Sequence, residues 1–399
     1  MKKKRILLLT SVLCASLMFA CGPKEPEISV QPEPEVIDSS DLGFDEPEVE
    51  EEVVVEEEPV EEVEVLPEGY VRSAVTNELI TEELANQRPI AVMIPMDQVA
   101  QPDFNNSKAG VIYEFPVEGS ITRTMNIIED WQDLEKIGNI RSTRDYFIWM
   151  SWEWDPILLH DGGPAIYITD YLKQDIVNNI SGRGFRDSSR SAPHNEYYSA
   201  KIINQWCESL GYQTTHRDQY WNETSKNHFK FAKFGGETDL TQDYSDALEV
   251  YTVDMKECYP VTKSKFEYNA EDGLYYRYIY GSPHMDNADP ENPVQLSFKN
   301  LIIMRCEGKS RDAKDYRFFN IMQSPNKEGY FLTNGHAIHI HWDKAAANET
   351  PTKFYDDNGN EITLSTGKTM ICVVQDGGSA SMDFIFQDSN GNTVDAAFK

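Results

Sequence analysis

The sequence predicts an α+β protein: an N-terminal α/β domain and then a mostly antiparallel β domain, both behind a disordered acidic tether. In the first half, short apolar runs typical of buried strands alternate with stretches of helical periodicity. In the second half, strand-like runs follow one another with turn residues between them. We therefore expect four parts, over residues 1–20, 21–66, 67–255 and 256–399.

The N-terminus has the pattern of a signal peptide. Four basic residues, 2–5, precede an apolar run from Ile6 to Phe19, shorter than the roughly 20 apolar residues that span a bilayer. Ala20 and Cys21 follow, and this end resembles the lipobox of bacterial lipoproteins. We expect cleavage before Cys21 and a lipid on its thiol, which would anchor the chain to the extracytoplasmic face of the cell membrane. An uncleaved N-terminal anchor is the alternative.

Residues 22–66 form a strongly acidic segment. They contain 18 Asp and Glu residues against one basic residue, Lys24, with repeated Pro and Val. Such a composition buries too little apolar surface to offset chain entropy, so it predicts a disordered tether. The chain's net charge is −31; the segment supplies −17 and the leader +4, so the rest carries −18. An acidic body argues against nucleic-acid binding and against membrane contact beyond the anchor.

The first folded part combines predicted strands and helices. Buried strands are expected over Pro89–Ile94, Val111–Phe115, Ile121–Ile128 and Pro156–His160. Helices are expected over Arg144–Trp152, Ile168–Asn178 and Ala200–Leu210, the last of which is followed by Gly211 as a stop signal. Residues 214–246 are polar and aromatic, and we expect loops and connectors there.

Strands dominate the prediction beyond residue 251. They are expected over Ser264–Tyr268, Leu274–Tyr280, Leu296–Met304, Arg317–Met322, His336–Trp342, Thr352–Tyr355, Glu361–Leu364, Thr369–Val374 and Met382–Phe386. Asn358 and Gly359 mark a hairpin, because both residue types tolerate positive φ.

The cysteines leave two possibilities open. Cys207, Cys258, Cys306 and Cys372 remain in the processed chain. In an exported protein they could form two disulfides in three connectivities, or stay as buried free thiols.

Histidines are concentrated in residues 335–343, GHAIHIHWD. In a strand, His339 and His341 would share one face, opposite the apolar residues. With Asp343 nearby, they would hold a metal only if a third ligand came from a neighbouring strand. A half-buried strand with a solvent face more often explains such a pattern. We therefore predict no metal site and no cofactor.

Polar residues at predicted strand ends and helix starts form the candidate binding site. Loops at strand ends are where α/β sheets usually place ligands. Arginines gathered there could bind a carboxylate or phosphate, or be neutralised by nearby carboxylates in structural ion pairs. The candidates are Glu114, Arg123, Arg141, Arg144, Asp145, His160, Asp161, His194 and Asn195.

Several longer motifs resemble a known family. In order they are RPIAVMI, IYEFPVEGSITR, IGNIRSTRDYF, HDGGPAIY and RSAPHNEYYS, then FEYNAEDGLYYRYIYGSPHMD, NGHAIHIHWDK and FYDDNGNEITLSTGKTMICVV. With the leader, the chain from about Leu66 onward closely resembles the YerB-like lipoproteins of Gram-positive bacteria. The resemblance implies a two-part architecture, divided here near residue 255. It implies no activity and no catalytic residues, since the family is known chiefly as a domain of unknown function in the cell envelope.

Three functions are compatible with these features. The leading hypothesis is a lipoprotein that binds an anionic envelope ligand or partner protein through the arginines and His160. A hydrolase of a wall polymer or phosphodiester is the second, with His160 as general base oriented by Asp161 or Glu114, and Arg141 and Arg144 stabilising negative charge. Solute capture for a transporter is the third, and it predicts a deep cleft between the two domains.

Overall fold

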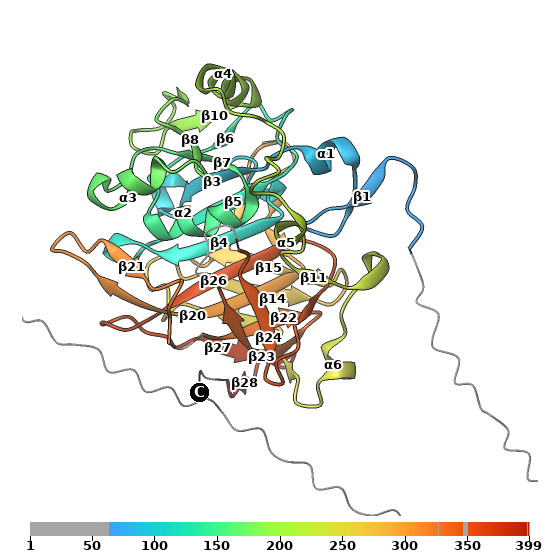
Figure 1. Cartoon of the computed structure of the whole chain (residues 1–399). Coiled ribbons are helices and arrows are strands. Elements are labelled where there is room, and N and C mark those ends of the chain that lie inside the picture. Colours follow the sequence, from blue (N-terminus) through green and yellow to red (C-terminus); the bar gives the residue numbers. More distant parts are fainter. Residues whose placement is uncertain (1–63, 326, 346–349, 397, 399) are drawn as a thin grey trace, which may run out of the picture. The chain divides into compact units, whose positions relative to one another are not determined.

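The computed structural model describes residues 64–399 except 326, 346–349, 397 and 399. The predicted leader, Cys21 and nearly all of the predicted tether lie outside the described residues. Within them, strands predominate over helices, as Figure 1 shows.

A twelve-stranded sheet contains strands from both halves of the chain. Its order is β12 (Leu248–Glu249), β23 (His336–Asp343), β22 (Glu328–Thr333), β20 (Asn300–Ser310), β26 (Thr369–Asp376), β4 (Val111–Pro116), β5 (Thr122–Ile128), β3 (Ile90–Pro95), β7 (Ile157–His160) and β8 (Asn178–Ser181), with β21 (Arg317–Phe319) on β20 and β24 (Lys353–Asp356) on β23. β4 pairs in parallel with β26 and antiparallel with β5. This large sheet therefore joins the two halves at its centre.

A seven-stranded sheet is built from residues 252–394, almost all of them in the second half of the chain. Its strands are β16 (Ser282–Pro283), β15 (Leu274–Ile279), β14 (Lys265–Asn269), β13 (Thr252–Asp254), β27 (Ile385–Gln387) and β28 (Thr393–Val394), with β19 (Ser297–Phe298) on β15. The small sheets are β1 (Tyr70–Arg72) with β2 (Leu79–Thr81), β6 (Ile137–Gly138) with β10 (Glu196–Tyr198) and β9 (Phe185–Arg186), β11 (Lys230–Phe231) with β25 (Thr363–Leu364), and β17 (Met285–Asp286) with β18 (Val294–Gln295).

The helices are short and mostly lie at the periphery of the sheets. They are α1 (Glu82–Asn86), α2 (Asp145–Ser151), α3 (Ala165–Leu172), α4 (Ala200–Leu210), α5 (Glu223–Lys226) and α6 (Leu240–Asp243). Single 3-10 turns span Gln98–Ala100, Asn106–Lys108, Glu118–Ser120, Trp152–Trp154 and Lys233–Gly235.

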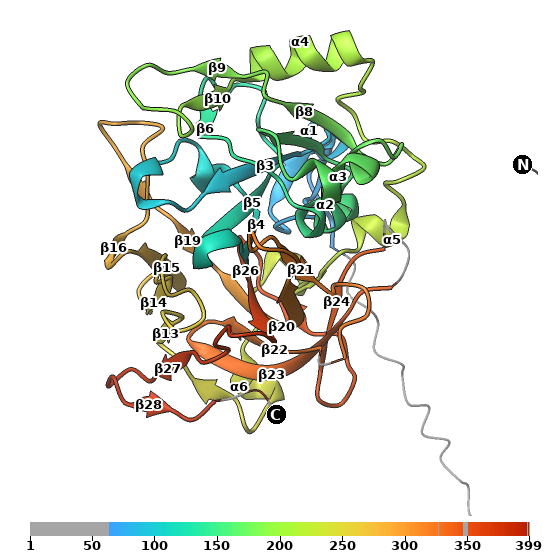
Figure 2. The ribbon, with the colours of Figure 1, turned by 90° about the vertical axis from the view of Figure 1, so that its left-hand side faces the viewer.

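Two hydrophobic cores cover the two faces of the large sheet. On one face, Met93 and Phe115 pack with Tyr146 and Phe147 of α2. On the other, alternate residues of the same strands pack with the seven-stranded sheet and with α4. Figure 2 shows the smaller sheet and helices α2 and α3 on opposite sides of the large sheet. A strand buried on both faces must be apolar throughout, which explains the continuous apolar run of β3 and most of β4.

Most of the predicted elements are confirmed. The apolar runs of the first half form β3, β4, β5 and β7, and the helix expected over 200–210 is α4. Ser199 caps its first turn by accepting from the backbone N–H of Ile202, and Gly211 ends it with φ of +70°. The predicted hairpin is present, although of its two central residues only Gly359 takes a positive φ.

Two predictions for the first half were wrong. The helix expected over 168–178 spans Ala165–Leu172 instead, and Asn178–Ser181 forms β8, which pairs in parallel with β7. Residues 214–246 are not loops alone, since they contain α5, α6 and β11. Helices and strands together fit the predicted α+β class, but the first half holds more strand than the α/β prediction implies.

Strands from both sides of residue 255 share the large sheet, and the division there stays a prediction. Of the two alternatives for the cysteines, disulfides or free thiols, the structure has free thiols. All four are buried: Cys207, Cys258, Cys306 and Cys372.

Candidate functional site

Three of the nine candidate residues, Arg123, Arg141 and His194, meet at one edge of the large sheet. β3 ends at Pro95, which is paired with Arg123 at the start of β5. The backbone N–H of Arg141 donates to the carbonyl oxygen of Met93 at 2.9 Å, so the segment after β6 runs beside the end of β3. His194 comes from the loop that leads into β10. The residues thus lie where β3 leaves the sheet, as expected for a ligand site.

Two residues that the sequence did not suggest complete this group. Asp97 follows β3 directly, and Arg190 comes from the same loop as His194. Arg190 is held by the carbonyl oxygens of Ala100 and Pro102, the latter at 2.6 Å from Nη2. We call the five residues the basic cluster: Asp97, Arg123, Arg141, Arg190 and His194.

Mutual electrostatic effects show that the members of the basic cluster are neighbours. Burial lowers the pKa of His194; the carboxylate of Asp97 opposes this shift, while Arg141, Arg123 and Arg190 add to it. Burial also lowers the pKa of Arg123 to about 9, helped by the positive charges of Arg144 and Arg141. At neutral pH the Arg123 guanidinium therefore keeps its charge, and the His194 imidazole is neutral.

Several polar atoms of the basic cluster are buried without a partner. Among the described residues, Asp97 Oδ2, Arg123 Nε, Arg141 Nε and His194 Nδ1 have no hydrogen-bond partner. Arg123 uses Nη1 to donate to the carbonyl oxygen of Ser142 at 2.6 Å. The Arg141 side chain makes no hydrogen bond or ion pair with any described residue. Buried polar groups in proteins are nearly always paired, so these four atoms distinguish the basic cluster from the ion pairs around it.

Two other candidates are neutralised within the chain. Arg144 donates from Nε to Glu118 at 2.7 Å, and its ion pair with this carboxylate is partly buried. Asp145, at the start of α2, pairs with Arg311 from the second half of the chain. These residues border the basic cluster, but their charges are already balanced.

Asp161 and Asn195 belong to a different arrangement, centred on Arg186. The guanidinium of Arg186 contacts Asp161 at 3.0 Å, Glu196 at 2.7 Å and Asn195 at 3.2 Å. Burial raises the pKa of Glu196, and the neighbouring Asp161 raises it further. Arg186 therefore neutralises carboxylates of its own strand pair and the adjoining loop.

His160 lies at the end of β7 but points into the protein. It is only 1% exposed, with Nδ1 at 2.8 Å from the carbonyl oxygen of Gly162 and Nε2 at 3.2 Å from Oδ1 of Asn179. Burial lowers its pKa, so the imidazole is neutral. Both ring nitrogens face oxygen atoms of the chain, so neither is directed towards a substrate.

Glu114 is placed in the core instead of the candidate site. Its carboxylate pairs with Arg277 at 2.8 Å, and both side chains are completely buried. Thr122 donates to it at 2.6 Å and Ser264 at 3.0 Å. The charge that interrupts the apolar strand β4 is thus satisfied by β15 of the smaller sheet, and Glu114 joins the two sheets.

A cavity adjoins the basic cluster on the side of the smaller sheet. It has a volume of about 260 Å³ and lies between residues 98–102 and 279–285. The Tyr280 hydroxyl, on its wall, donates to the carbonyl oxygen of Met96 at 2.7 Å. Burial raises the pKa of Tyr280, and the charge of Asp97 adds to this shift. The segment after β3 therefore separates the basic cluster from a recess large enough for a small group.

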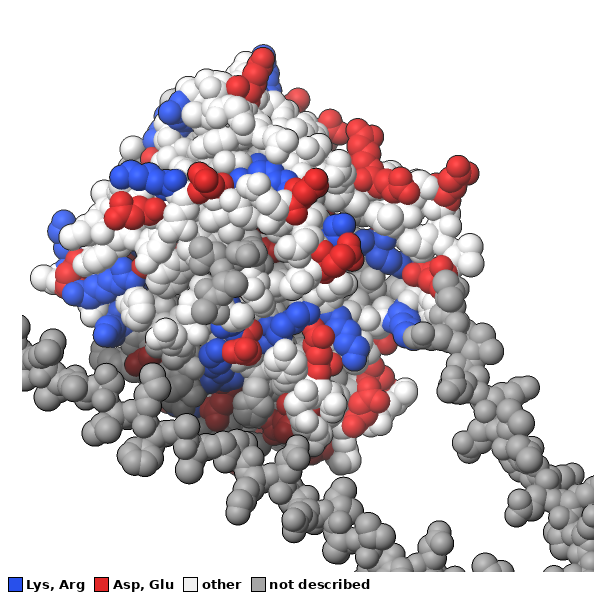
Figure 3. All heavy atoms as spheres, in the orientation of Figure 1, with Lys and Arg blue, Asp and Glu red and all other residues white. Residues whose placement is uncertain are grey.

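The surface charge is mixed on the face that Figure 3 shows. Basic and acidic side chains are interspersed over most of it, and acidic ones gather near α1, whose first turn carries Glu82 and Glu83. On this face, no broad basic area is seen.

Comparisons with known proteins agree on one family. Residues 75–213 match the family described as "Protein of unknown function (DUF3048) N-terminal domain", and residues 253–371 match its C-terminal domain. A Bacillus subtilis (strain 168) protein described as "Putative lipoprotein YerB" is 26% identical over 317 residues, which cover 78% of this chain and 88% of the relative.

A solved structure shows the same fold. The crystal structure of the YerB protein from Bacillus subtilis matches with a TM-score of 0.63 and 22% identity, over 77% of this chain and 97% of that one. The chain carries both parts of the family in the same order and therefore belongs to the YerB-like family of unknown function.

Proposed function

We propose that the protein is an extracytoplasmic lipoprotein, held at the cell membrane by a lipid on Cys21, that binds an anionic group through the basic cluster. The leader, the lipobox pattern and the description of the Bacillus subtilis relative support the anchor. The ligand is a component of the cell envelope or an acidic surface of a partner protein. The described residues contain no helix long and apolar enough to cross a membrane.

The guanidinium of Arg141 carries the proposal. Among the described residues it has no carboxylate or carbonyl partner, although Arg144, three positions later, has Glu118. Its neighbour Arg123 is also positive and only 3% exposed. An acidic protein has carboxylates in excess. Two adjacent guanidinium groups that have no carboxylate partner therefore favour binding of an anion from outside the chain.

The cluster favours a carboxylate or phosphate that also carries a hydroxyl. Two guanidinium groups can bind such an anion with paired N–H donors. Asp97 beside them can accept from a hydroxyl or amine of the same ligand. Neutral His194 can donate from one ring nitrogen without adding charge. A ligand with both kinds of group, such as a glycerol phosphate unit, matches this set.

Binding of small anions tests the proposal. The processed lipoprotein is purified in detergent, and its thermal unfolding is followed with inorganic phosphate, glycerol 3-phosphate or D-glutamate. A ligand at 100 times its Kd should stabilise the fold by about 2.7 kcal/mol. We expect Arg141→Gln to lower the apparent affinity, derived from the thermal shift, by at least tenfold.

Arg183→Gln is the matched control, because Arg183 is exposed and stacks on Trp206 at 3.9 Å, away from the basic cluster. Equal shifts in the two variants would place anion binding elsewhere and overturn the proposal. Shifts with none of the three probes would rule out small anions as sufficient ligands.

The anchor is tested separately. Cys21→Ala should release the protein from the membrane fraction and remove the lipid mass from the N-terminal peptide in mass spectrometry. Retention of the variant in washed membranes would contradict the lipid anchor and favour an uncleaved leader.

No comparable observation on the described residues favours the hydrolase hypothesis or the solute-capture hypothesis. The hydrolase hypothesis depended on His160, whose ring nitrogens both face groups of the chain. Solute capture predicts a cleft between two domains, whereas the large sheet is continuous across residue 255.

A further inference from the structure

A second polar cluster lies on β23, away from any residue of the proposed binding site. His339 and His341 both contact the carboxylate of Asp357: Nδ1 of His339 lies 2.5 Å and Nε2 of His341 lies 3.1 Å from Oδ1. The two imidazole rings are 5.1 Å apart, and one ligand atom from each of the three residues lies within 4.8 Å of the others. Two histidines and one carboxylate thus converge on one point.

The third residue, Asp357, comes from the turn that follows the neighbouring strand. β24 pairs antiparallel with β23, with Tyr355 opposite His341. Asp356 ends β24, and its side chain accepts from the backbone N–H groups of Asn358 at 2.9 Å and Asn360 at 2.8 Å. This tight turn fixes the backbone of Asp357 above the two histidines. Asp343, closer in sequence, is paired with Lys327 instead.

The surroundings orient the histidines. The ring of Tyr330 on β22 packs edge-on against His339 at 5.5 Å, and Tyr330 also packs against Phe384 and Phe386. Nε2 of His339 is buried without a partner among the described residues, so Nδ1 is the nitrogen that this ring offers. The His341 side chain is 50% exposed, which leaves the cluster accessible from solvent.

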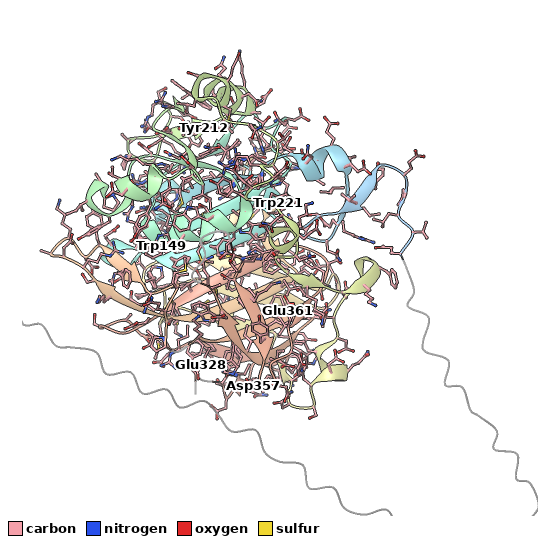
Figure 4. All side chains as sticks on the ribbon, in the orientation of Figure 1. Trp149, Tyr212, Trp221, Glu328, Asp357 and Glu361 are labelled. Atoms are coloured by element: carbon pink, nitrogen blue, oxygen red, sulfur yellow. The ribbon has the colours of Figure 1, made fainter. Side chains whose placement is uncertain are left out.

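A further carboxylate stands on the same face of the sheet. Glu328 on β22 is directly opposite His341, and residues opposite each other in an antiparallel pair share one face. Arg305 holds Glu328 at 2.6 Å. Figure 4 labels Glu328 and Asp357 in the same lower region of the sheet.

We propose that His339, His341 and Asp357 bind a divalent transition-metal ion of the Zn²⁺ type. Two imidazole nitrogens and one carboxylate oxygen are a ligand set that Zn²⁺ uses where a fourth position stays open to water or substrate. Alternate residues of one strand present both imidazoles to the same side. Mg²⁺ and Ca²⁺ prefer oxygen ligands, so the two nitrogens select against them.

The distances require only small adjustments. Metal–ligand bonds of about 2.0–2.1 Å in tetrahedral geometry place two ligand atoms roughly 3.3 Å apart. The His341–Asp357 distance of 3.1 Å is already close to this value, and the His339–Asp357 distance of 2.5 Å would lengthen when a metal ion lies between the two groups.

Zinc binding to the untagged lipoprotein tests the proposal. Protein in detergent is stripped with EDTA, dialysed against ZnCl₂, and its metal content measured by mass spectrometry. We expect one tightly bound Zn²⁺ per chain, not displaced by a hundredfold excess of MgCl₂. Co²⁺ in its place should give the intense visible absorption of a four-coordinate site.

Two substitutions and one control locate the ion. His341→Gln and Asp357→Asn should each weaken Zn²⁺ binding by at least tenfold and abolish the Co²⁺ bands. Both side chains are half-exposed, so the EDTA-treated variants should unfold at the wild-type temperature. His336→Gln, on the same strand but outside the cluster, should bind as the wild type does. Equal binding in all four proteins, absence of bound Zn²⁺, or displacement by MgCl₂ would overturn the site.

Discussion

At the scale of single residues, the most consequential feature is the charge pair between the two sheets. Glu114 and Arg277 are both fully buried, and the hydroxyl groups of Thr122 and Ser264 donate further hydrogen bonds to the carboxylate. Removing one partner from such a pair leaves an uncompensated buried charge, whereas replacing both by apolar groups is often neutral.

Glu114→Gln should therefore lower the free energy of unfolding by about 3–5 kcal/mol, because Arg277 stays charged in the core. Urea unfolding followed by circular dichroism measures it. The double variant Glu114→Gln with Arg277→Met should recover much of the loss. Asp170→Asn, which removes an exposed partner of Lys173, should change stability by less than about 1 kcal/mol. A loss in Glu114→Gln no larger than in Asp170→Asn would contradict this account.

Glu129 gives the free energy of unfolding a pH dependence opposite in sign to that of most carboxyl groups. Burial raises the pKa of Glu129 to about 7, although Ser73 donates to its carboxylate at 2.7 Å. Between the unfolded pKa of about 4.5 and about 7, the folded state holds a proton that the unfolded state has lost. This contribution to stability is complete below pH 4.5 and is lost as the pH rises to 7.

Glu129→Gln mimics the protonated acid and should remove this dependence. We expect the variant to be more stable than the wild type at pH 8, by on the order of 1 kcal/mol, and nearly equal to it at pH 4. Urea unfolding at the two pH values measures the difference, with Glu82→Gln on exposed α1 as the control. A variant that is less stable than the wild type at pH 8 would show that the ionised Glu129 carboxylate stabilises the fold, which contradicts a raised pKa.

The candidate site shows which of its features could be predicted from the sequence and which could not. The motif IRSTRD marked both Arg141 and Arg144, but nothing in it distinguishes the arginine that Glu118 neutralises from the one without a partner. Arg190 and Asp97 were missed, although Arg190 begins the segment that contains His194 and Asn195. The loops that carry them are brought to the end of β3 only by the folded sheet. Residue types could thus be predicted, whereas their pairing depends on contacts between distant segments.

At the scale of elements, helix α4 is the clearest case of local determination. Its amphipathic sequence, Ser199 before it and Gly211 after it set both ends, so its bounds could be predicted. β8 shows the opposite. Asn178–Ser181 has no alternation of its own, and it becomes a strand because β7 offers a free edge in parallel register. The end of α3 was misplaced for the same reason.

Gly211→Ala should lower the free energy of unfolding by about 1 kcal/mol. Gly211 has φ of +70° and open space around it, so an added Cβ costs backbone strain and no clash. Gly211→Asn should cost less, because Asn tolerates this conformation better. Chemical unfolding compares the two variants. Equal losses for both would point to crowding instead of backbone strain.

At the scale of the whole molecule, the large sheet makes the two halves interdependent. β4 is buried on both faces and lies between β26 and β5. Without β26 its backbone groups would form an exposed edge lined by apolar side chains. The overall α+β class followed from the sequence, but this shared sheet did not, because strand order depends on long-range pairing that periodicity does not encode.

Residues 64–255 expressed alone should consequently lack a cooperative unfolding transition and should aggregate, whereas co-expression with residues 256–399 should restore a soluble complex. Gel filtration and thermal unfolding of the fragments and their mixture measure this. A soluble 64–255 fragment with a sharp transition of its own would instead support an independent domain ending near residue 255.

The parallel pairing of β4 with β26 also determines when the large sheet can form during synthesis. Val111 lies beside Thr369, so the central strand pair cannot close until almost the entire polypeptide has been made. Contacts between such distant segments slow folding, because a large loop must be ordered before they form. The large sheet of the nascent protein therefore stays incomplete through most of its synthesis. Under the proposed export, this delay would keep the chain in a state that can be threaded across a membrane before it folds.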